Sequence, residues 1–400
     1  MRDILNGAAA AGSNTRAMVT ACPVCGADAQ RFLVRESVPA NQNLLLSSRE
    51  RARDVTRGTL ALHACGTCGF VFNAAFAPDR LEYGATYENT QTASQAFAQY
   101  LDGRVARVVE RCGPHATTIV EVGCGKGTFL ARVVEAAVGS TGYGFDTSYE
   151  GPDSVRDGRL RFFKHYFAGG HVPEPVDALV CRHVIEHVPD PIAFLGSIRD
   201  VLESKTTKIF FETPCVEWIV RNQVLWDFFY EHCSYFNAAS LEEAFRRAGF
   251  EVAGVRHVFG GQYLWLEATP ASARRTSPTD GGRVLELCRE FAAAQSAALE
   301  RWMLRLRALR EHGKLAIWGA GAKGVTFAGL VDPHAALFDC VVDVNPRKQG
   351  CFVPGTGHAI VAPEELAERD IRTAVLMNPN YRHENERMLA TMGCAVTLVE

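Results

Sequence analysis

The stretch TIVEVGCGKGTFL, Thr118 to Leu130, decides the fold of the central part of this 400-residue chain. Its apolar first half is typical of a buried strand, and it runs directly into a turn with glycines at Gly123, Gly125 and Gly127. A helix is predicted to follow from Thr128 to Ala137. Glycines let a ligand approach the backbone closely, and the free amides of a helix N-terminus suit a polar or anionic group. We therefore predict a ligand site at this turn.

Two acidic residues narrow the choice of ligand. Glu121 stands two residues before the first glycine, and Asp146 ends the next apolar run, TGYGFDTS, where a carboxylate can accept both hydroxyls of a ribose. A dinucleotide site reads G-x-G-x-x-G and keeps acid out of its turn, because a pyrophosphate lies there. The spacing here is G-x-G-x-G with acid just upstream, which favours a cofactor that carries an ammonium and a sulfonium and no phosphate.

In this acidic, three-glycine form, the segment resembles the first motif of the class I S-adenosylmethionine-dependent methyltransferases. The resemblance implies a Rossmann-like domain that binds S-adenosylmethionine through Glu121, the three glycines and Asp146. A glycine-rich strand-to-helix turn that holds no ligand is the alternative.

Size and charge argue against several classes of protein. A chain of 400 residues with 47% hydrophobic residues can bury more than one core, so we expect two or three domains. A net charge of -3 and a pI near 6.5 argue against nucleic acid as the main partner. The sequence has no apolar run of membrane-spanning length and no continuous signal-peptide core. We therefore expect a soluble, cytoplasmic protein that acts on a small molecule.

The chain has 13 cysteines, of which Cys22 and Cys25, and again Cys65 and Cys68, form C-x-x-C pairs that are each followed by glycine. The others are scattered singly, which is typical of metal binding in a reducing compartment. Four thiolates complete a tetrahedral zinc site and leave no position for water, so we predict a structural zinc ion. His63 is a weaker candidate ligand. A pair of thioredoxin-like redox dithiols is the alternative.

The order of elements predicts an α/β protein with a small N-terminal zinc module and two Rossmann-like domains. Residues 1–19 are predicted to be a flexible tail and residues 20–85 the zinc-binding module. Residues 86–270 alternate apolar strands with amphipathic helices and end in a hairpin, which predicts a doubly wound, mostly parallel sheet for the methyltransferase domain. Residues 271–283 are polar and predict a linker.

The last segment, residues 284–400, is predicted to be the second Rossmann-like domain. It begins with a long helix, Val284 to His312, that braces the domains. The turn GAGAKG, Gly319 to Gly324, then has true G-x-G-x-x-G spacing, and Asp343 ends the next strand. Read alone, this pattern is a dinucleotide fingerprint, so an NAD-dependent oxidoreductase is the alternative function. A turn that is kept only for close packing of helix on sheet is a further alternative.

Three features together resemble the three-domain sugar C-methyltransferases of deoxysugar biosynthesis, over nearly the whole chain. They are the C-x-x-C pairs, the E-H-x-x-D-P-like and Y-E-H-like segments of the central part, and the C-terminal GAGAKG with NPRKQGCFVPGTGHAIVAPEEL. The resemblance implies C-methylation of a small polar acceptor, such as a keto-sugar nucleotide, that lies between the central and C-terminal domains near the second glycine turn. O- or N-methylation of another small metabolite remains an alternative.

C-methylation needs a base, because a carbon beside a ketone is only weakly acidic, and donors that stabilise the enolate oxygen. One candidate cluster, RHVIEHVPDP, follows the fourth strand at the end where open sheets bind ligands. Its His183 and His187 are four residues apart, which predicts one helical face for both. The resemblance places His187 toward the substrate and His183 at the cofactor. A metal site at this pair is disfavoured, because Pro189 stops any helix soon afterwards.

The second candidate cluster is FFYEHCSYF, an aromatic run interrupted by Glu231 and His232. Burying both groups requires a hydrogen-bonding partner for each, and a carboxylate beside an imidazole raises the basicity of the imidazole. We predict that His232 is the general base, or the group that orients the base, with Glu231 as support. The chain departs from the sugar enzymes at two positions: Phe229 stands where they have tyrosine, and Phe259 where they commonly have histidine.

Three further residues are candidates for the acceptor side of the site. Tyr87 matches a tyrosine that the family places between the zinc module and the cofactor, whereas an exposed linker tyrosine is the alternative. Lys323 beside the second glycine turn and Lys348 in NPRKQG are candidates to meet a phosphate or carboxylate of the substrate, although surface lysines are common.

Overall fold

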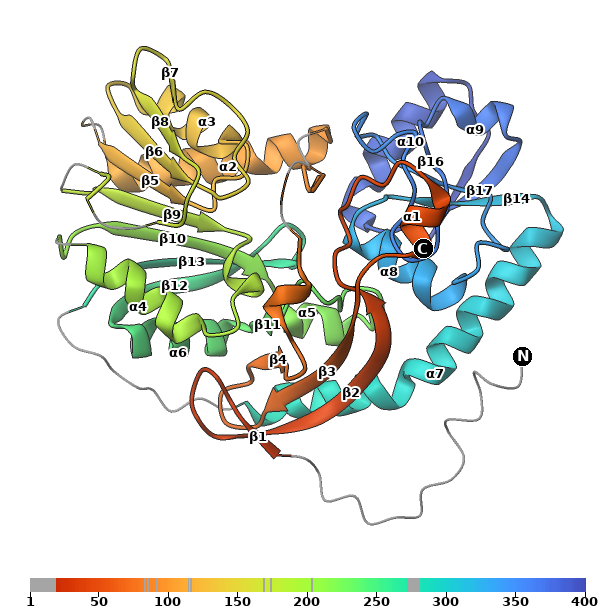
Figure 1. The fold of residues 1–400 in the computed structure, drawn as a ribbon, viewed down its shortest axis with the longest axis horizontal. Helices are drawn as coiled ribbons and strands as arrows, with labels where there is room; N and C mark the ends of the chain where they lie inside the picture. Colours follow the sequence, from red (N-terminus) through yellow and green to blue (C-terminus); the bar gives the residue numbers. More distant parts are fainter. Residues whose placement is uncertain are drawn as a thin grey trace.

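The computed structural model describes residues 19–82, 84, 86–90, 93–113, 115, 117–167, 170–172, 175–202, 204–271 and 281–400. These residues form three sheets, which Figure 1 shows as three parts of the molecule. The predicted flexible tail lies outside the described residues except for Val19, and so does most of the predicted linker at residues 271–283.

The N-terminal sheet is antiparallel and is built on one long hairpin of β2 and β3. In order of pairing, its strands are β1 (Val19–Ala21), β2 (Asp28–Pro39), β3 (Arg57–Cys65), β4 (Val71–Asn73) and β11 (Ser234–Tyr235). The short helices α1 (Arg49–Arg53) and η1 (Pro78–Arg80) lie in its connections. β11 comes from the central part of the chain, so the sheet ties the Glu231–His232 segment to the zinc module. The sequence did not indicate this pairing.

The central sheet has eight strands and is mostly parallel. In order of pairing, they are β12 (Phe250–Val258), β13 (Tyr263–Pro270), β10 (Lys208–Pro214), β9 (Ala178–Arg182), β5 (Thr118–Val122), β6 (Thr141–Phe145), β8 (Leu160–Phe163) and β7 (Ser154–Val155). β12 and β13 form the predicted closing hairpin. β5 and β9 are parallel neighbours, and the strand order switches sides between them, because β6 and β8 follow β5 on one side whereas β9 and β10 lie on the other. In such sheets ligands bind at the carboxyl ends beside this switch point.

Helices cover both faces of the central sheet, which makes it doubly wound. They are α2 (Gln95–Cys112), α3 (Thr128–Ala136), α4 (Pro191–Val201) and α6 (Ala238–Ala248). The short helix α5 (Val216–Arg221) instead joins the core of the N-terminal module, with Leu60 and Leu62. The apolar faces of α2 and α3 join one core with Ile119 and Val180, whereas those of α4 and α6 join another with Val120 and Phe211. Alternate residues of a strand face opposite sides of the sheet, so the two cores are separated by β5 itself.

The C-terminal sheet is entirely parallel. In order of pairing, its strands are β16 (Ile360–Val361), β15 (Cys340–Val342), β14 (Lys314–Trp318), β17 (Ile371–Leu376) and β18 (Thr397–Val399). Its helices are α8 (Ala322–Val331), α9 (Glu365–Glu368), η3 (Pro379–Tyr381) and α10 (Arg382–Thr391). The predicted fold class is therefore confirmed: an α/β protein with an N-terminal four-cysteine module, a central doubly wound sheet and a second, parallel Rossmann-like sheet.

The predicted long helix is α7 (Gly282–Glu311), and it spans the molecule along one side (Figure 1). Its first half packs Phe291 against Leu60 of the zinc module, and its second half packs Leu306 against Leu315 of the C-terminal sheet. The helix is thus a brace between these parts, as its length suggested.

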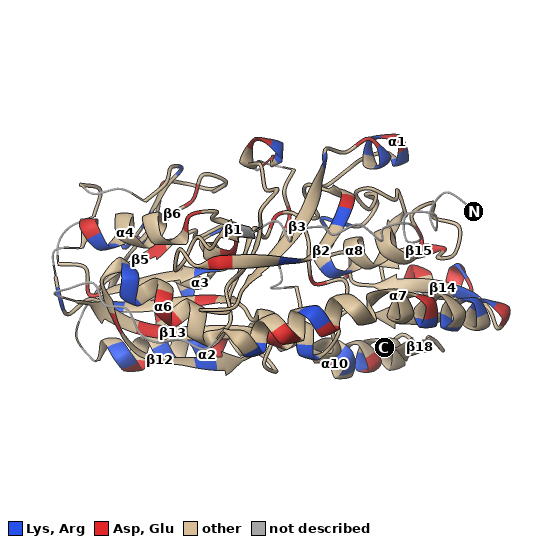
Figure 2. Ribbon diagram, turned by 90° about the horizontal axis from the view of Figure 1, so that it is seen from below, with Lys and Arg blue, Asp and Glu red and all other residues tan. Residues whose placement is uncertain are grey.

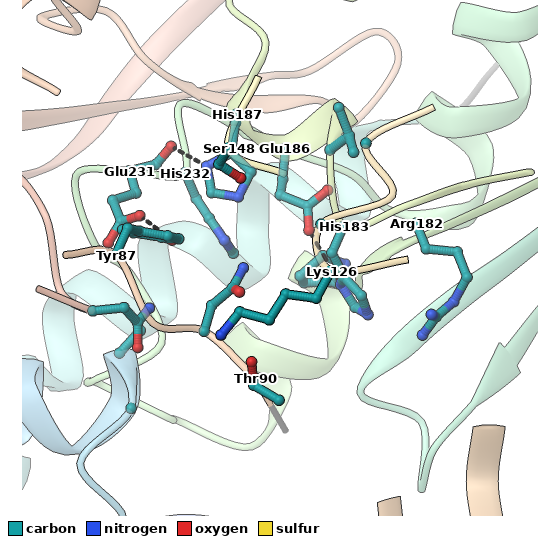
Figure 3. Close-up of a pocket in the computed structure, with 18 of the residues that line it drawn as sticks. Tyr87, Thr90, Lys126, Ser148, Arg182, His183, Glu186, His187, Glu231 and His232 are labelled. Atoms are coloured by element: carbon teal, nitrogen blue, oxygen red, sulfur yellow. Dashed lines mark hydrogen bonds and ion pairs between the residues drawn. The ribbon is translucent and has the colours of Figure 1, made fainter. Parts of the chain in front are cut away.

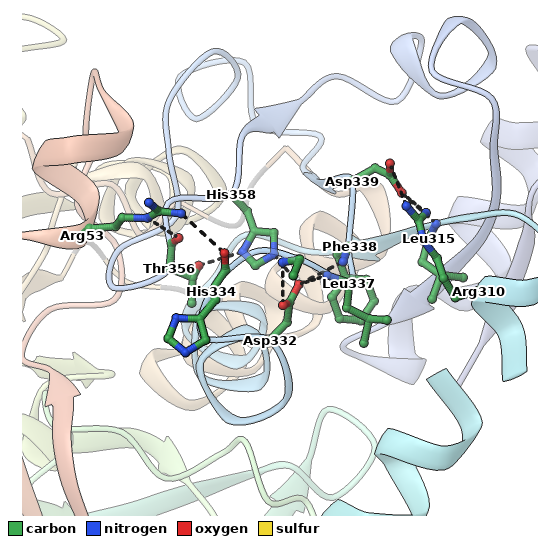
Figure 4. Close-up of polar contacts among 11 residues, drawn as sticks. Arg53, Arg310, Leu315, Asp332, His334, Leu337, Phe338, Asp339, Thr356 and His358 are labelled. Carbon is green, nitrogen blue, oxygen red and sulfur yellow. Dashed lines mark hydrogen bonds and ion pairs between the residues drawn. The ribbon is translucent and has the colours of Figure 1, made fainter. Parts of the chain in front are cut away.

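Hydrogen bonds from Arg53 join the N-terminal module to the C-terminal part beside a buried contact between His358 and Asp332 (Figure 4). His358 Nε2 lies 2.9 Å from Asp332 Oδ2, and the same oxygen accepts the backbone N–H groups of Leu337 and Phe338, which follow α8. Arg53 of α1 donates to the carbonyl oxygens of Thr356 (3.4 Å) and His334 (3.5 Å), which flank this pair. Helix α1 is therefore fixed to the C-terminal part by polar contacts.

Basic and acidic residues alternate along α7 and α10 on the side of the molecule that Figure 2 shows. This mixed pattern agrees with the small net charge of -3. Among the described residues, no helix combines the length and apolar character that crossing a bilayer requires.

Candidate active site

A cavity of about 1070 Å³ lies at the carboxyl ends of the central strands. Its lining comes from the first glycine turn, the two histidine clusters, the second glycine turn and the loop of the zinc module that contains Asn43. All three parts of the chain therefore contribute to one site, and Figure 3 shows side chains from the two histidine clusters together with Tyr87 and Lys126.

Two of the three glycines of the first turn pack closely against neighbouring side chains, and the third is open to the cavity. A Cβ at Gly123 would lie 2.1 Å from Val184, and one at Gly127 would lie 2.4 Å from Phe162. A Cβ at Gly125 would meet nothing within 4 Å, because this glycine lines the cavity. All three glycines have positive φ, a conformation that residues other than glycine rarely adopt, which lets the backbone turn tightly at the edge of the cavity.

The two predicted acidic residues flank this turn. Glu121 is buried, its Oε2 accepts from Leu130 N at 3.1 Å, and burial raises the pKa of its carboxyl to about 8 although the charge of Arg182 opposes the rise. Asp146 accepts Gly125 N at 2.8 Å through Oδ2, and Ser148 N at 2.8 Å through Oδ1. Asp146 Oδ1 also accepts the hydroxyl of Ser148 at 2.6 Å, so the remaining acceptor capacity of Asp146 toward the cavity lies at Oδ2. The turn fits an adenosylmethionine-like ligand.

His183 lies directly after β9 with a left-handed backbone, at φ 54. Its ring contacts two buried carboxylates, with Nε2 at 2.7 Å from Glu212 Oε1 and Nδ1 at 3.2 Å from Glu186 Oε1. Burial alone would lower the pKa of His183, but these carboxylates raise it to about 9. The ring is therefore an imidazolium at neutral pH, and it balances charge in the wall of the cavity.

The prediction that His183 and His187 share a helical face is wrong. The left-handed backbone at His183 interrupts any helix there, and only Ile185–His187 form a short 3-10 turn, η2. The two rings consequently face different groups. His183 contacts Glu186 and Glu212, whereas His187 Nδ1 lies 3.0 Å from the backbone oxygen of Glu231. A carbonyl oxygen only accepts, so Nδ1 of His187 carries a proton.

Glu231 is buried and both of its carboxylate oxygens accept hydrogen bonds. Gln42 N donates to Oε1 and the hydroxyl of Tyr87 donates to Oε2, each at 2.5 Å (Figure 3). Burial raises the pKa of Glu231, while nearby His187 and these two donors oppose the rise. Tyr87 is thus not an exposed linker residue, because it connects the segment after the zinc module to the Glu231–His232 pair.

His232 faces the cavity beside His187 and Phe229. The ring centroids lie 4.7 Å from His187, edge to face, and 4.2 Å from Phe229. Among the residues that the structure describes, none forms a hydrogen bond with the ring nitrogens of His232. Burial and the neighbouring His187, His183 and Lys323 hold its pKa well below the usual value of 6.5. The imidazole is therefore neutral and can accept a proton.

The two departures from the sugar enzymes have structural consequences. Phe229 lies in the cavity wall without a hydroxyl, and Tyr230 does not replace it, because its hydroxyl accepts Ala77 N at 2.8 Å outside the cavity. Phe259 stacks on Tyr263 at 5.1 Å and is not a lining residue. The cavity therefore lacks a hydroxyl at both positions.

The second glycine turn lines the opposite side of the cavity. A Cβ at Gly324 would lie 1.8 Å from the carbonyl oxygen of Gly319, so close packing of α8 on this turn accounts for that glycine. Lys323 at the start of α8 pairs with Asp227 at 2.8 Å. Lys348 is buried and donates to Asn43 Oδ1 at 3.1 Å, and burial lowers the pKa of its ammonium. Both lysines are thus cavity residues with protein partners.

The four predicted cysteines meet at the far end of the β2–β3 hairpin. The sulfurs of Cys22 and Cys68 are 3.6 Å apart, those of Cys25 and Cys65 are 3.4 Å apart, and all four lie within 4.8 Å of one another. A tetrahedral zinc ion with Zn–S bonds of about 2.3 Å places its sulfurs about 3.8 Å apart, so the cluster fits zinc. His63 is not in this cluster, since its Nδ1 lies 3.0 Å from the carbonyl oxygen of Ala61.

Several residues in the cavity wall or directly behind it were missed from the sequence. Gln42 contributes a backbone N–H and Asn43 a short side chain from a loop without any motif. Glu88, Asp227 and Glu212 are single acids in unremarkable contexts, and only their burial in the fold distinguishes them. Nothing in one sequence signals that such residues converge.

Two family models match this chain. Residues 95–255 match "Methyltransferase domain", and residues 279–394 match "C-methyltransferase C-terminal domain". The chain is 25% identical over 390 residues to the C-methyltransferase NovU of Streptomyces niveus. The alignment covers 91% of this chain and 90% of that protein. It is therefore a methyltransferase enzyme that depends on S-adenosylmethionine and carries a C-methyltransferase C-terminal domain.

Solved methyltransferase structures match a part of the chain. One is N,N-8-amino-8-demethyl-D-riboflavin dimethyltransferase from Streptomyces davawensis, at 21% identity and a TM-score of 0.35, covering 44% of this chain and 55% of that one. Another is magnesium protoporphyrin IX methyltransferase from Synechocystis PCC 6803 with bound SAH, at 17% identity and a TM-score of 0.33, covering 44% and 84%.

Proposed function

We propose that this enzyme methylates a carbon atom of a small polar acceptor, such as a keto-sugar nucleotide, and that His232 removes the proton from that carbon. The observation that carries the proposal is the position of His232. Its neutral ring faces a cavity that has the first glycine turn on one side and the second on the other. The C-methyltransferase match of the C-terminal part and the name of NovU support carbon as the acceptor atom.

The methyl donor is assigned to the first glycine turn. Glu121, Gly123, Gly125, Gly127 and Asp146 would hold it, with His183 in the adjoining wall. When bound, S-adenosylmethionine supplies an electrophilic methyl group on a sulfonium. The protein's own contribution on this side is a glycine turn that a ligand can approach closely, flanked by two acids that suit the ribose hydroxyls and the cationic groups of the ligand.

His232 is the proposed general base. Because its pKa lies well below 6.5, the ring is unprotonated at neutral pH and its unpaired nitrogen can take the proton from a carbon beside a ketone. The resulting enolate carbon is the nucleophile that a methyl donor requires. Phe229 packs against the ring at 4.2 Å and limits its rotation.

Glu231, Tyr87 and His187 are proposed to fix the base and to meet the acceptor. The two hydrogen bonds to the Glu231 carboxylate fix the backbone that carries His232, and His187 binds the same backbone through its Nδ1. Tyr87 and His187 both line the cavity beside this pair, and we assign them to the wall that meets the acceptor.

The polar end of the acceptor is assigned to the second glycine turn. Lys323, Lys348 and the N-terminal end of α8 give this side positive charge, which suits the phosphates of a nucleotide sugar. The alternative function, an NAD-dependent oxidoreductase, would place NAD at this turn. The match to a C-methyltransferase domain over residues 279–394 supports a role in acceptor binding instead.

Calorimetric titration tests the cofactor assignment. We expect the metal-loaded protein to bind S-adenosylhomocysteine and not NADH, and Asp146→Ala to weaken this binding. Binding of NADH without binding of S-adenosylhomocysteine would overturn the proposal. Mass spectrometry of small molecules that co-purify with the protein then identifies the acceptor, which we expect to contain a nucleotide.

We further propose that the four-cysteine cluster holds one structural zinc ion. With four thiolate ligands the ion has no open position, so it supports the β2–β3 hairpin and takes no part in the reaction. The opposite end of the same hairpin leads into Gln42 and Asn43, which contact Glu231 and Lys348. Zinc is thereby linked to the order of the active site through the two strands.

A further inference from the structure

Glu88 is a buried carboxylate that lies between the two glycine turns. Its side chain is 0% exposed although it follows the zinc module in a segment with no regular structure. Its Oε2 accepts from Lys126 Nζ at 2.6 Å and pairs with Arg347 Nε at 2.9 Å. Its Oε1 accepts from Thr90 N at 3.0 Å and from Asn345 Nδ2 at 3.3 Å. One carboxylate thus binds groups from distant parts of the chain.

Lys126 connects Glu88 to the first glycine turn. It stands between Gly125 and Gly127, whose φ values are 53 and 73, so the position of its backbone is set by the turn itself. Asp146 holds the same turn through Gly125 N at 2.8 Å. A ligand that orders this turn therefore also orders the stem of Lys126.

Asn345 connects Glu88 to the second glycine turn. Its backbone N–H donates to Asp343 Oδ1 at 2.8 Å, and Asp343 Oδ2 accepts Ala320 N, within that turn, at 2.8 Å. Arg347 donates its own N–H to Asn345 Oδ1 at 3.0 Å. A continuous line of hydrogen bonds thus runs from the first turn through Lys126, Glu88, Asn345 and Asp343 to the second.

The charge of the Glu88 carboxylate makes this line of hydrogen bonds difficult to rearrange. Burial would raise the pKa of Glu88, but the hydrogen bonds from Lys126 and Thr90 hold it down to about 2, so the carboxylate is ionised at neutral pH. A buried charge without a partner is strongly unfavourable, and at 0% exposure water cannot replace Lys126. When one partner is fixed, the others are restrained with it.

We propose that Glu88 is a positioning residue that couples methyl-donor binding at the first turn to the order of the second turn and of the loop after Asp343. This inference rests on the proposed placement of the methyl donor at the first turn. Its consequence is that the acceptor side of the cavity becomes ordered once the donor is bound. The chain of contacts is physically continuous, and an energetic measurement is what establishes coupling.

Hydrogen exchange of the full-length, zinc-loaded protein tests the coupling, with S-adenosylhomocysteine as the probe. In the wild type we expect the probe to slow exchange about fivefold or more in residues 319–324 and 343–348, as well as in the first turn. In Glu88→Gln we expect protection of the first turn only, and an affinity for the probe that is about 5- to 150-fold weaker. The matched control is Glu384→Gln, which removes another inter-domain carboxylate, one that binds Ser94 and Gln95 and does not touch Lys126. This control variant should retain the slowed exchange in residues 319–324 and 343–348.

A second variant keeps the test decisive if Glu88→Gln does not fold. Lys126→Met removes the first link at a side chain that is 35% exposed, and it should bind the probe but lose the slowing at residues 319–324 and 343–348. Equal slowing in the wild type and in either folded variant would overturn the coupling, as would probe binding without distant slowing in the wild type. If the wild-type protein does not bind the probe at all, the proposed function is overturned, and the coupling with it.

Discussion

The imidazole rings of His187 and His232 meet edge to face, with centroids 4.7 Å apart. They come from different elements, since His187 ends η2 after the fourth parallel strand and His232 lies in the aromatic run before β11. One ring is fixed by the backbone of Glu231, and the other is free toward the cavity. This asymmetry supports the proposal that His232 is the base and that His187 orients it.

We expect His232→Asn to lower turnover by about 100- to 10,000-fold, which is the usual contribution of a general base. The affinity for S-adenosylhomocysteine should stay nearly the same, because the ring does not line the first glycine turn. Steady-state kinetics and calorimetry measure the two quantities. His257→Asn, at an exposed histidine of β12, is the matched control and should leave both unchanged. Equal losses of turnover and of affinity in His232→Asn would mean that the residue is structural.

Tyr87→Phe should lower turnover by about 10- to 100-fold, because it removes a hydrogen bond to a buried carboxylate, a contact that contributes about 1.5–3 kcal/mol. The melting temperature should also fall, because the same contact stabilises the folded protein. Tyr230→Phe removes a buried hydroxyl that binds Ala77 away from the cavity, so it should reduce stability and keep turnover. The proposed role of Tyr87 would be contradicted if the two variants showed the same pattern.

The imidazolium of His183 should make stability depend on pH. Its pKa is raised from 6.5 to about 9 in the folded protein, so its contribution is fully present below pH 6.5 and is lost as the pH rises through 9. A shift of this size corresponds to a contribution on the order of 3 kcal/mol. His183→Asn, which tolerates the left-handed backbone, should therefore be less stable than the wild type at pH 6 and nearly equal to it above pH 9.

Thermal unfolding across this pH range measures the effect of His183. His257→Asn should show no pH-dependent difference from the wild type. A constant difference between His183→Asn and the wild type from pH 6 to pH 10 would mean that His183 is neutral in the folded protein.

Removal of the proposed zinc ion should loosen the β2–β3 hairpin and the loop at its other end. We expect Cys65→Ser to lose the metal and to lower the melting temperature by at least about 5 °C. Cys394→Ser changes a free cysteine outside the cluster and should alter neither. Elemental analysis and calorimetry measure the two quantities. Less than one equivalent of zinc in the wild type, or an unchanged melting temperature in Cys65→Ser, would contradict the structural role.

Local patterns in the sequence were sufficient for the main elements of the fold. Alternating apolar strands and amphipathic helices predicted the doubly wound sheet, and the helical spacing after residue 283 predicted α7 to within two residues at its start and one at its end. The C-x-x-C pairs predicted the cysteine cluster because four thiols at that spacing have few other arrangements.

Contacts between distant segments were not predictable in the same way. β11 has two residues, too few for any periodicity, and its pairing with β4 depends on the tertiary fold. His183 and His187 have helical spacing, but the backbone of His183 is left-handed, which no pattern signals. Glu88 is one acid among many, and only the fold buries it between the glycine turns.

The most direct test of the central claim is the fate of the methyl group. The enzyme is incubated with S-adenosylmethionine that carries a deuterated methyl group and with keto-sugar nucleotides, and the product is examined by mass spectrometry and NMR. We predict a product in which the deuterated methyl group is bonded to the carbon beside the ketone, and no such product with His232→Asn. A deuterated methyl group on oxygen or nitrogen, or an undiminished yield with His232→Asn, would contradict the account.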